Sequence, residues 1–62
     1  MNQRQLELIE RLDILRTIID FHVNNQTRLW KNQQEFEAYI DAILDEINDV
    51  KAELKEMGYD NY

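Results

Sequence analysis

Three kinds of side chain in this sequence could do chemistry: one imidazole, two threonine hydroxyls and a row of carboxylates. His22 is the single histidine, and because there is no cysteine or serine, a hydroxyl nucleophile would have to be Thr17 or Thr27. Neither threonine has a base and an acid placed near it in the sequence. A lone histidine cannot build an imidazole metal site, and a disulfide or a thiolate site is excluded. We therefore expect no enzyme activity, no catalytic residue, no cofactor and no metal.

The carboxylates form the one regular pattern of charged groups. Asp41, Asp45 and Asp49 recur every fourth residue, so on a helix they lie along one stripe, where like charges repel by a few tenths of a kcal/mol per pair. Regularly spaced carboxylates on a helix can imitate the phosphates of a nucleic acid and occupy the basic groove of a protein that binds one. The plainer interpretation is a solvated face that keeps a small protein soluble. Both interpretations place these residues on a surface.

Charge is divided unevenly between the two halves of the chain. Residues 1–34 carry five basic against four acidic groups, a net charge of +1, and residues 35–62 carry two against nine, a net charge of −7, which together give −6. An acidic second half argues against nucleic-acid binding, because affinity for phosphate comes chiefly from Lys and Arg. It favours a partner with a basic surface.

The chain must use helices to position these groups. It has no proline and a single glycine, and the apolar residues from Phe36 to Met57 are spaced by four and three, as in a coiled-coil seam. A helix with so narrow an apolar stripe needs another helix against it, and 62 residues make at most one domain, 1–62. The sequence therefore predicts an all-α protein that works by helix association.

Capping residues indicate where the helices begin and end. Asn2 with Gln5 and Asn32 with Glu35 are spaced as capping boxes, and Gly58 can end the last helix in the left-handed conformation. Because Asn and Thr weaken the stretch 24–27, we expect a helix over about 3–24, a loop over about 25–31 and a helix over about 33–57. Residues 59–62 form a short tail, with Tyr59 folded back over the end of the second helix.

Folding near residue 28 brings two apolar stripes of similar length together as an antiparallel hairpin. The predicted core between the helices comprises Leu8, Leu12, Leu15, Ile19, Phe36, Ile40, Ile43, Ile47, Val50 and Leu54. His22 continues the first stripe and has a structural role, and Leu29 and Trp30 would close the end of the hairpin. Since both stripes share one heptad register, a single long helix in a parallel coiled-coil dimer is the alternative.

The first helix carries more apolar surface than one partner helix covers. Ile14, Ile18 and Phe21 lie about a third of a turn from the seam, and Trp30 and Tyr39 add to this surface. Two hairpins paired as a homodimeric four-helix bundle would bury it, and so would docking on a different protein. These five residues, with Asp41, Asp45 and Asp49, are the partner-binding candidates.

The function that this sequence favours is that of a small acidic protein-binding module, an inhibitor or adaptor of the kind that phages and plasmids encode against host factors. One alternative is a structural oligomerisation or scaffold coiled coil, and another is a nucleic-acid mimic that uses the acidic face. A third is an RNA-binding helical bundle, because the architecture, though no motif, is similar to that of the plasmid-encoded bundle Rop. No apolar run approaches the roughly 18 residues of a membrane span, so we expect a cytoplasmic protein with no membrane contact.

Overall fold

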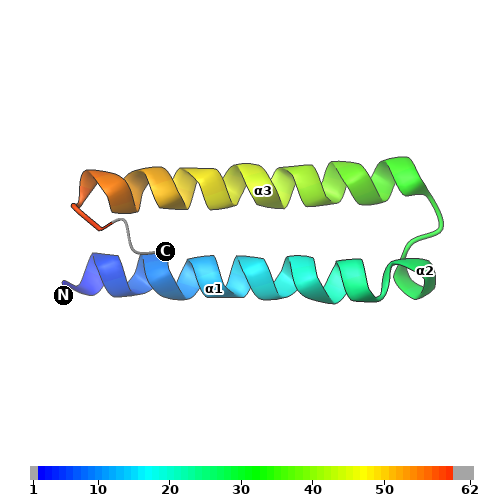
Figure 1. The fold of residues 1–62 in the computed structure, drawn as a ribbon, viewed down its shortest axis with the longest axis horizontal. Coiled ribbons are helices and arrows are strands. Elements are labelled where there is room, and N and C mark those ends of the chain that lie inside the picture. Colours follow the sequence, from blue (N-terminus) through cyan, green and yellow to red (C-terminus); the bar gives the residue numbers. More distant parts are fainter. Residues whose placement is uncertain (1, 60–62) are drawn as a thin grey trace.

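The chain folds back on itself as a helical hairpin. The computed structural model describes residues 2–59, which form α1 (Gln3–Asn24), α2 (Gln26–Leu29) and α3 (Gln33–Glu56). The two long helices lie side by side and antiparallel in a rod of 42 × 15 × 15 Å, and α2 lies at its closed end (Figure 1). The prediction of an all-α hairpin is confirmed, and the single continuous helix is not formed.

The helix starts follow the predicted capping residues. The Asn2 side chain accepts a hydrogen bond from the Gln5 backbone N–H at 2.8 Å, and the Gln5 side chain accepts one from the Asn2 N–H at 3.3 Å. The Asn32 side chain accepts from the Glu35 N–H at 3.1 Å, which is the first half of a second such box. These bonds satisfy N–H groups that the first turn of each helix would otherwise leave unpaired.

Helix α3 ends in a Schellman motif built on the only glycine. Gly58 has a φ of +83°, its N–H donates to the Lys55 carbonyl at 3.0 Å, and the Tyr59 N–H donates to the Leu54 carbonyl at 2.9 Å. Tyr59 is thereby turned back and packs against the hydrophobic core, as expected. The rest of the predicted tail, residues 60–62, lies outside the described residues.

The predicted loop over residues 25–31 is wrong in its middle part. Asn25 interrupts the first helix, where its backbone N–H and its side-chain amide both donate to the Phe21 carbonyl. The helix then resumes as α2, since the Leu29 N–H donates to the Asn25 carbonyl and the Trp30 N–H to the Gln26 carbonyl, each at 2.9 Å. The chain therefore reverses only at residues 30–32.

The later reversal changes which residues face each other. The Gln5 side chain donates to the Met57 carbonyl, and the ring centroids of His22 and Tyr39 lie 4.8 Å apart, so the two long helices pair about the reversal at residues 30–32. Leu8 therefore lies level with about residue 54, and not with the residue that folding near residue 28 would bring there.

The core is a single layer between the two long helices. Seven of the ten predicted core residues are buried, Ile19 and Ile43 are partly buried against them, and Ile40 is half-buried. Six of the buried residues form one aliphatic cluster, and Phe36 lies apart from it, near the closed end. The aliphatic cluster consists of Leu8, Leu12, Leu15, Ile47, Val50 and Leu54.

Candidate protein-binding face

Five rings pack together at the closed end of the hairpin and form what we call the aromatic cluster: Phe21, His22, Trp30, Phe36 and Tyr39. The His22 ring centroid lies 4.8 Å from that of Tyr39 and 5.7 Å from that of Trp30. Trp30 in turn lies 5.2 Å from Tyr39 and 5.8 Å from Phe36. These separations are those of favourable tilted and edge-to-face ring pairs. The cluster joins α1, the reversal and α3.

A hydrogen bond fixes the centre of the aromatic cluster. The indole Nε1–H of Trp30 donates to Nδ1 of His22 at 3.0 Å, and both side chains are half-buried. The indole nitrogen can only donate, so Nδ1 of His22 must be the unprotonated ring nitrogen. This contact agrees with the structural role expected for His22, and its existence depends on α2 carrying Trp30 back over α1.

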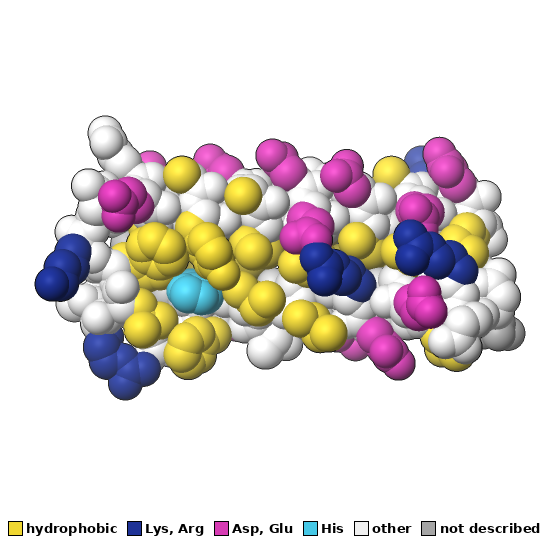
Figure 2. Space-filling model, turned by 180° about the vertical axis from the view of Figure 1, so that it is seen from behind, with side chains coloured by type: hydrophobic (Ala, Val, Ile, Leu, Met, Phe, Trp, Pro, Cys, Tyr) yellow, Lys and Arg dark blue, Asp and Glu magenta, His cyan; other side chains and the backbone are white. Residues whose placement is uncertain are grey.

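Apolar side chains spread from the aromatic cluster onto one face of the hairpin. Ile14 is 56% exposed and Phe21 is 50% exposed, while Ile18, Trp30 and Tyr39 are half-buried. Ile14, Ile18 and Phe21 follow the i, i+4, i+7 spacing that places side chains on one side of a helix. Figure 2 shows this face, with apolar side chains gathered around the single histidine towards the closed end. We call these five residues the closed-end patch.

Ion pairs occupy the other half of the face in Figure 2, towards the chain ends. Arg4 pairs with Glu53 at 2.7 Å and also approaches Glu7 at 3.6 Å, and Arg11 pairs with Glu46. All of these side chains are substantially exposed, so each pair contributes at most about 1 kcal/mol to stability. The face is thus apolar at one end and carries paired charges at the other.

The remaining partner-binding candidates lie elsewhere. Asp41, Asp45 and Asp49 are exposed on α3, and their helical positions are turned away from its buried residues. Acidic side chains line the edge of α3 that is remote from α1 in Figure 2. The structure therefore brings together the five apolar candidates and leaves the three aspartates on a different surface. Among the described residues, no group of three or more His, Asp or Glu side chains could hold a metal ion.

Four further large apolar side chains are exposed that were not among the predicted partner-binding residues. They are scattered over α1, α2 and α3 and do not belong to the aromatic cluster. Leu29 was expected to close the hairpin, but it faces outward from α2, because the extra helical turn leaves the closing position to Trp30. The four are Leu6, Val23, Leu29 and Leu44.

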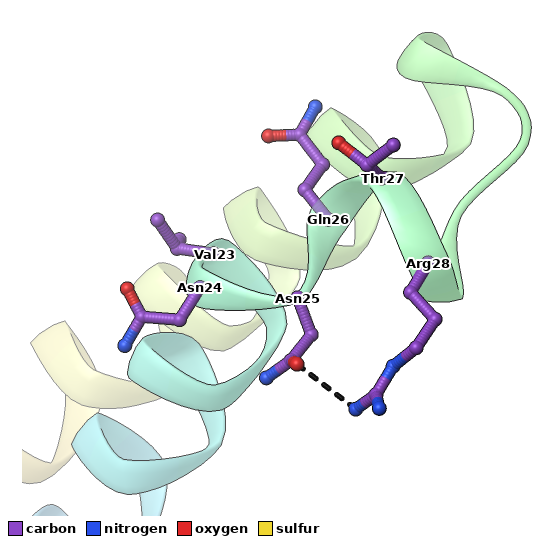
Figure 3. Close-up of a pocket in the computed structure, with 6 residues that line it drawn as sticks. All are labelled: Val23, Asn24, Asn25, Gln26, Thr27 and Arg28. Atoms are coloured by element: carbon purple, nitrogen blue, oxygen red, sulfur yellow. Dashed lines mark hydrogen bonds between the residues drawn. The ribbon is translucent and has the colours of Figure 1, made fainter.

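A shallow hollow lies where α1 meets α2, lined by residues 23–28 (Figure 3). Its lining is mostly carboxamide and hydroxyl groups, and Arg28 donates to the Asn25 side-chain oxygen at 2.9 Å across it. Its one hydroxyl, on Thr27, has no base among the lining residues. The hollow offers hydrogen bonds and no catalytic chemistry.

The fold is that of a two-helix hairpin with an exposed apolar patch on one face. Comparisons with known proteins do not assign it more narrowly. The chain matches no protein-family model, no curated protein and no solved structure. Within residues 2–59, none of the helices combines the length and the apolar character needed to cross a membrane.

Proposed function

We propose that this chain is a small protein-binding module, an inhibitor or adaptor, that docks on its partner through the closed-end patch. The observation that carries the proposal is the exposure of Phe21 and Ile14 beside half-buried Trp30 and Tyr39. Large aromatic side chains in a preorganised setting supply much of the energy of protein interfaces. Here the bond between Trp30 and His22 holds the rings in place before any partner arrives.

The overall charge supports a partner with a basic surface near its binding site. The chain carries a net charge of −6, and Asp41, Asp45 and Asp49 keep their carboxylates exposed. A negative field accelerates encounter with a positively charged surface, and the patch then provides the contact that persists.

RNA binding has less support. Three arginines of α1 could contact phosphate, namely Arg4, Arg11 and Arg16. Two of them already form ion pairs, Arg4 with Glu53 and Arg11 with Glu46. Cations that already pair with carboxylates neutralise little phosphate charge.

A comparison of matched variants tests the docking function. Phe21→Glu places a charge in the closed-end patch, whereas Val23→Glu places the same charge at a residue that is 49% exposed and turned away from the patch. A genuine partner, isolated on immobilised protein, should bind the wild type and Val23→Glu and should lose at least tenfold in affinity for Phe21→Glu. Equal binding to both variants would contradict the proposal.

A further inference from the structure

We infer that the closed-end patch is occupied by a second copy of this chain, in a four-helix bundle whose two-fold axis runs along the hairpin. In this arrangement α1 of each copy lies against α3 of the other. The inference rests on the proposed function only in that the patch is a protein-binding surface, and it names a second copy of the chain as the occupant in place of a different protein with a basic surface. Three observations carry it: the single-layer core, the size of the face and the distribution of charge.

One hairpin covers its apolar side chains incompletely, because its core is a single layer between two helices. Two helices bury seven large apolar residues between them, and Ile14 and Phe21 remain at least half exposed on the adjacent face. A chain of this size commonly needs a disulfide, a metal or another subunit to be stable. It has no cysteine, and its described residues offer no metal-binding group, so a subunit is the means that fits.

The face is large enough for a stable dimer. The accessible surface is 4701 Å², and in a rod of 42 × 15 × 15 Å each of the four long sides carries roughly a fifth of it, on the order of 1,000 Å². Standard interfaces bury about 800 Å² on each partner. One side of the hairpin therefore suffices, provided that the contact covers its whole length.

Charge selects the direction of the two-fold axis. Helix α3 carries eight carboxylates and two lysines, a net charge of −6, and α1 carries four carboxylates and three arginines, a net charge of −1. An axis across the hairpin would place α3 against α3, the most strongly repelling pair. An axis along the hairpin places α3 against α1 and keeps the two α3 helices on opposite corners of the bundle.

The same axis also suits the distribution of apolar and charged side chains along the face. Each residue then lies level with its own copy, so the Arg4–Glu53 and Arg11–Glu46 pairs of the two chains lie at the same heights along the rod, and ion pairs can continue across the interface. The aromatic clusters of the two chains likewise lie at the same end of the bundle. Apolar groups thus meet apolar groups at the closed end, and opposite charges meet at the other.

Sedimentation equilibrium over a range of concentrations tests whether a second copy occupies the closed-end patch. The wild type and Val23→Glu should have the mass of two chains at micromolar concentration, and Phe21→Glu and Ile14→Glu should weaken association at least tenfold. Loss of helicity together with loss of the dimer in the two patch variants alone would also support the inference, because the fold would then depend on this contact. Dimers that survive both patch variants, or that Val23→Glu also disrupts, would overturn it.

A single spin label tests the axis, since the chain has no native cysteine. Gln3→Cys lies at the open end of α1, which in the proposed bundle places the two labels within roughly 20 Å of each other, from helix spacings of about 10 Å. An axis across the hairpin would separate them by roughly 35 Å or more, at about 1.5 Å per residue. Electron–electron double resonance distinguishes these distances, and the longer one would overturn the arrangement.

Failure of this inference and failure of the proposed function give different results. A wild type that stays monomeric but binds a different protein in a Phe21-dependent way overturns the second copy as occupant and leaves the docking function intact. A dimer that forms through another surface, with no Phe21-dependent partner, overturns both.

Discussion

At the scale of single residues, the hydrogen bond between Trp30 and His22 ties the reversal of the chain to α1. Trp30→Phe keeps an aromatic ring and removes the donor, so we expect the free energy of unfolding to fall by about 1 kcal/mol, the usual worth of a half-buried hydrogen bond. Urea unfolding followed by circular dichroism measures this change. In a His22→Phe background the same substitution should cost much less, because the acceptor is already gone. An equal cost in both backgrounds would show that ring packing, and not the bond, matters.

Gly58 offers a second test at this scale, because a substitution there changes the strain of the backbone and no packing contact. A Cβ built at this position meets no atom within 4 Å, yet φ is +83°, where side chains other than glycine are strained. Gly58→Ala should therefore lower the free energy of unfolding by about 1 kcal/mol without any clash. Gly58→Asn should lower it less, since asparagine tolerates this conformation. A neutral Gly58→Ala substitution would mean that the end of α3 contributes nothing to stability.

At the scale of the helices, stability depends on the contact between α1 and α3. Leu54 has no exposed surface, so Leu54→Ala should cost about 2–5 kcal/mol. A domain of this length has about 3–9 kcal/mol in total, so this variant should lose a large share of its stability and unfold at a much lower temperature. Leu44→Ala, at an exposed position of the same helix, should change stability by no more than about 0.5 kcal/mol. Thermal unfolding of the two variants side by side makes the comparison, and similar losses would contradict the observed packing.

Much of this level of organisation can be predicted from the sequence. The spacing of apolar residues predicts which faces of α1 and α3 meet, and Asn2, Asn32 and Gly58 mark helix ends because each one satisfies backbone groups with its own side chain or conformation. These are local signals. They depend on residues within one turn of each other, which is why they are legible without the structure.

The closed end could not be predicted in the same way. Asn25 ends α1 as expected, but whether residues 26–29 coil again depends on where Trp30 finds its partners, His22 and Tyr39, which lie on two different helices. The helical wheel identified Ile14, Ile18 and Phe21 as a separate face, whereas the ring cluster that supports them required the chain reversal in three dimensions. Non-local contacts of this kind have no periodic signature in a sequence.

At the scale of the whole molecule, net charge opposes a compact fold. A charge of −6 on a rod 42 Å long creates repulsion that weakens as salt screens it. The exposed ion pairs of Arg4 with Glu53 and of Arg11 with Glu46 offset only part of this repulsion. The folded state should therefore gain stability as ionic strength increases.

Substitution of the acidic stripe tests both this repulsion and whether the carboxylates contact a partner. Replacing Asp41, Asp45 and Asp49 by asparagine removes two like-charged i, i+4 pairs, each worth about 0.2–0.5 kcal/mol, so the free energy of unfolding should rise by about 0.5–1 kcal/mol at low salt and by less at high salt. Urea unfolding at two ionic strengths measures both changes. If the stripe only keeps the protein soluble, the triple variant should be less soluble than the wild type. It should associate with its partner more slowly and dissociate at the wild-type rate. A large increase in the dissociation rate of a basic partner would instead show that the carboxylates are in contact with it, and unchanged stability at low salt would show that these charges do not repel one another appreciably.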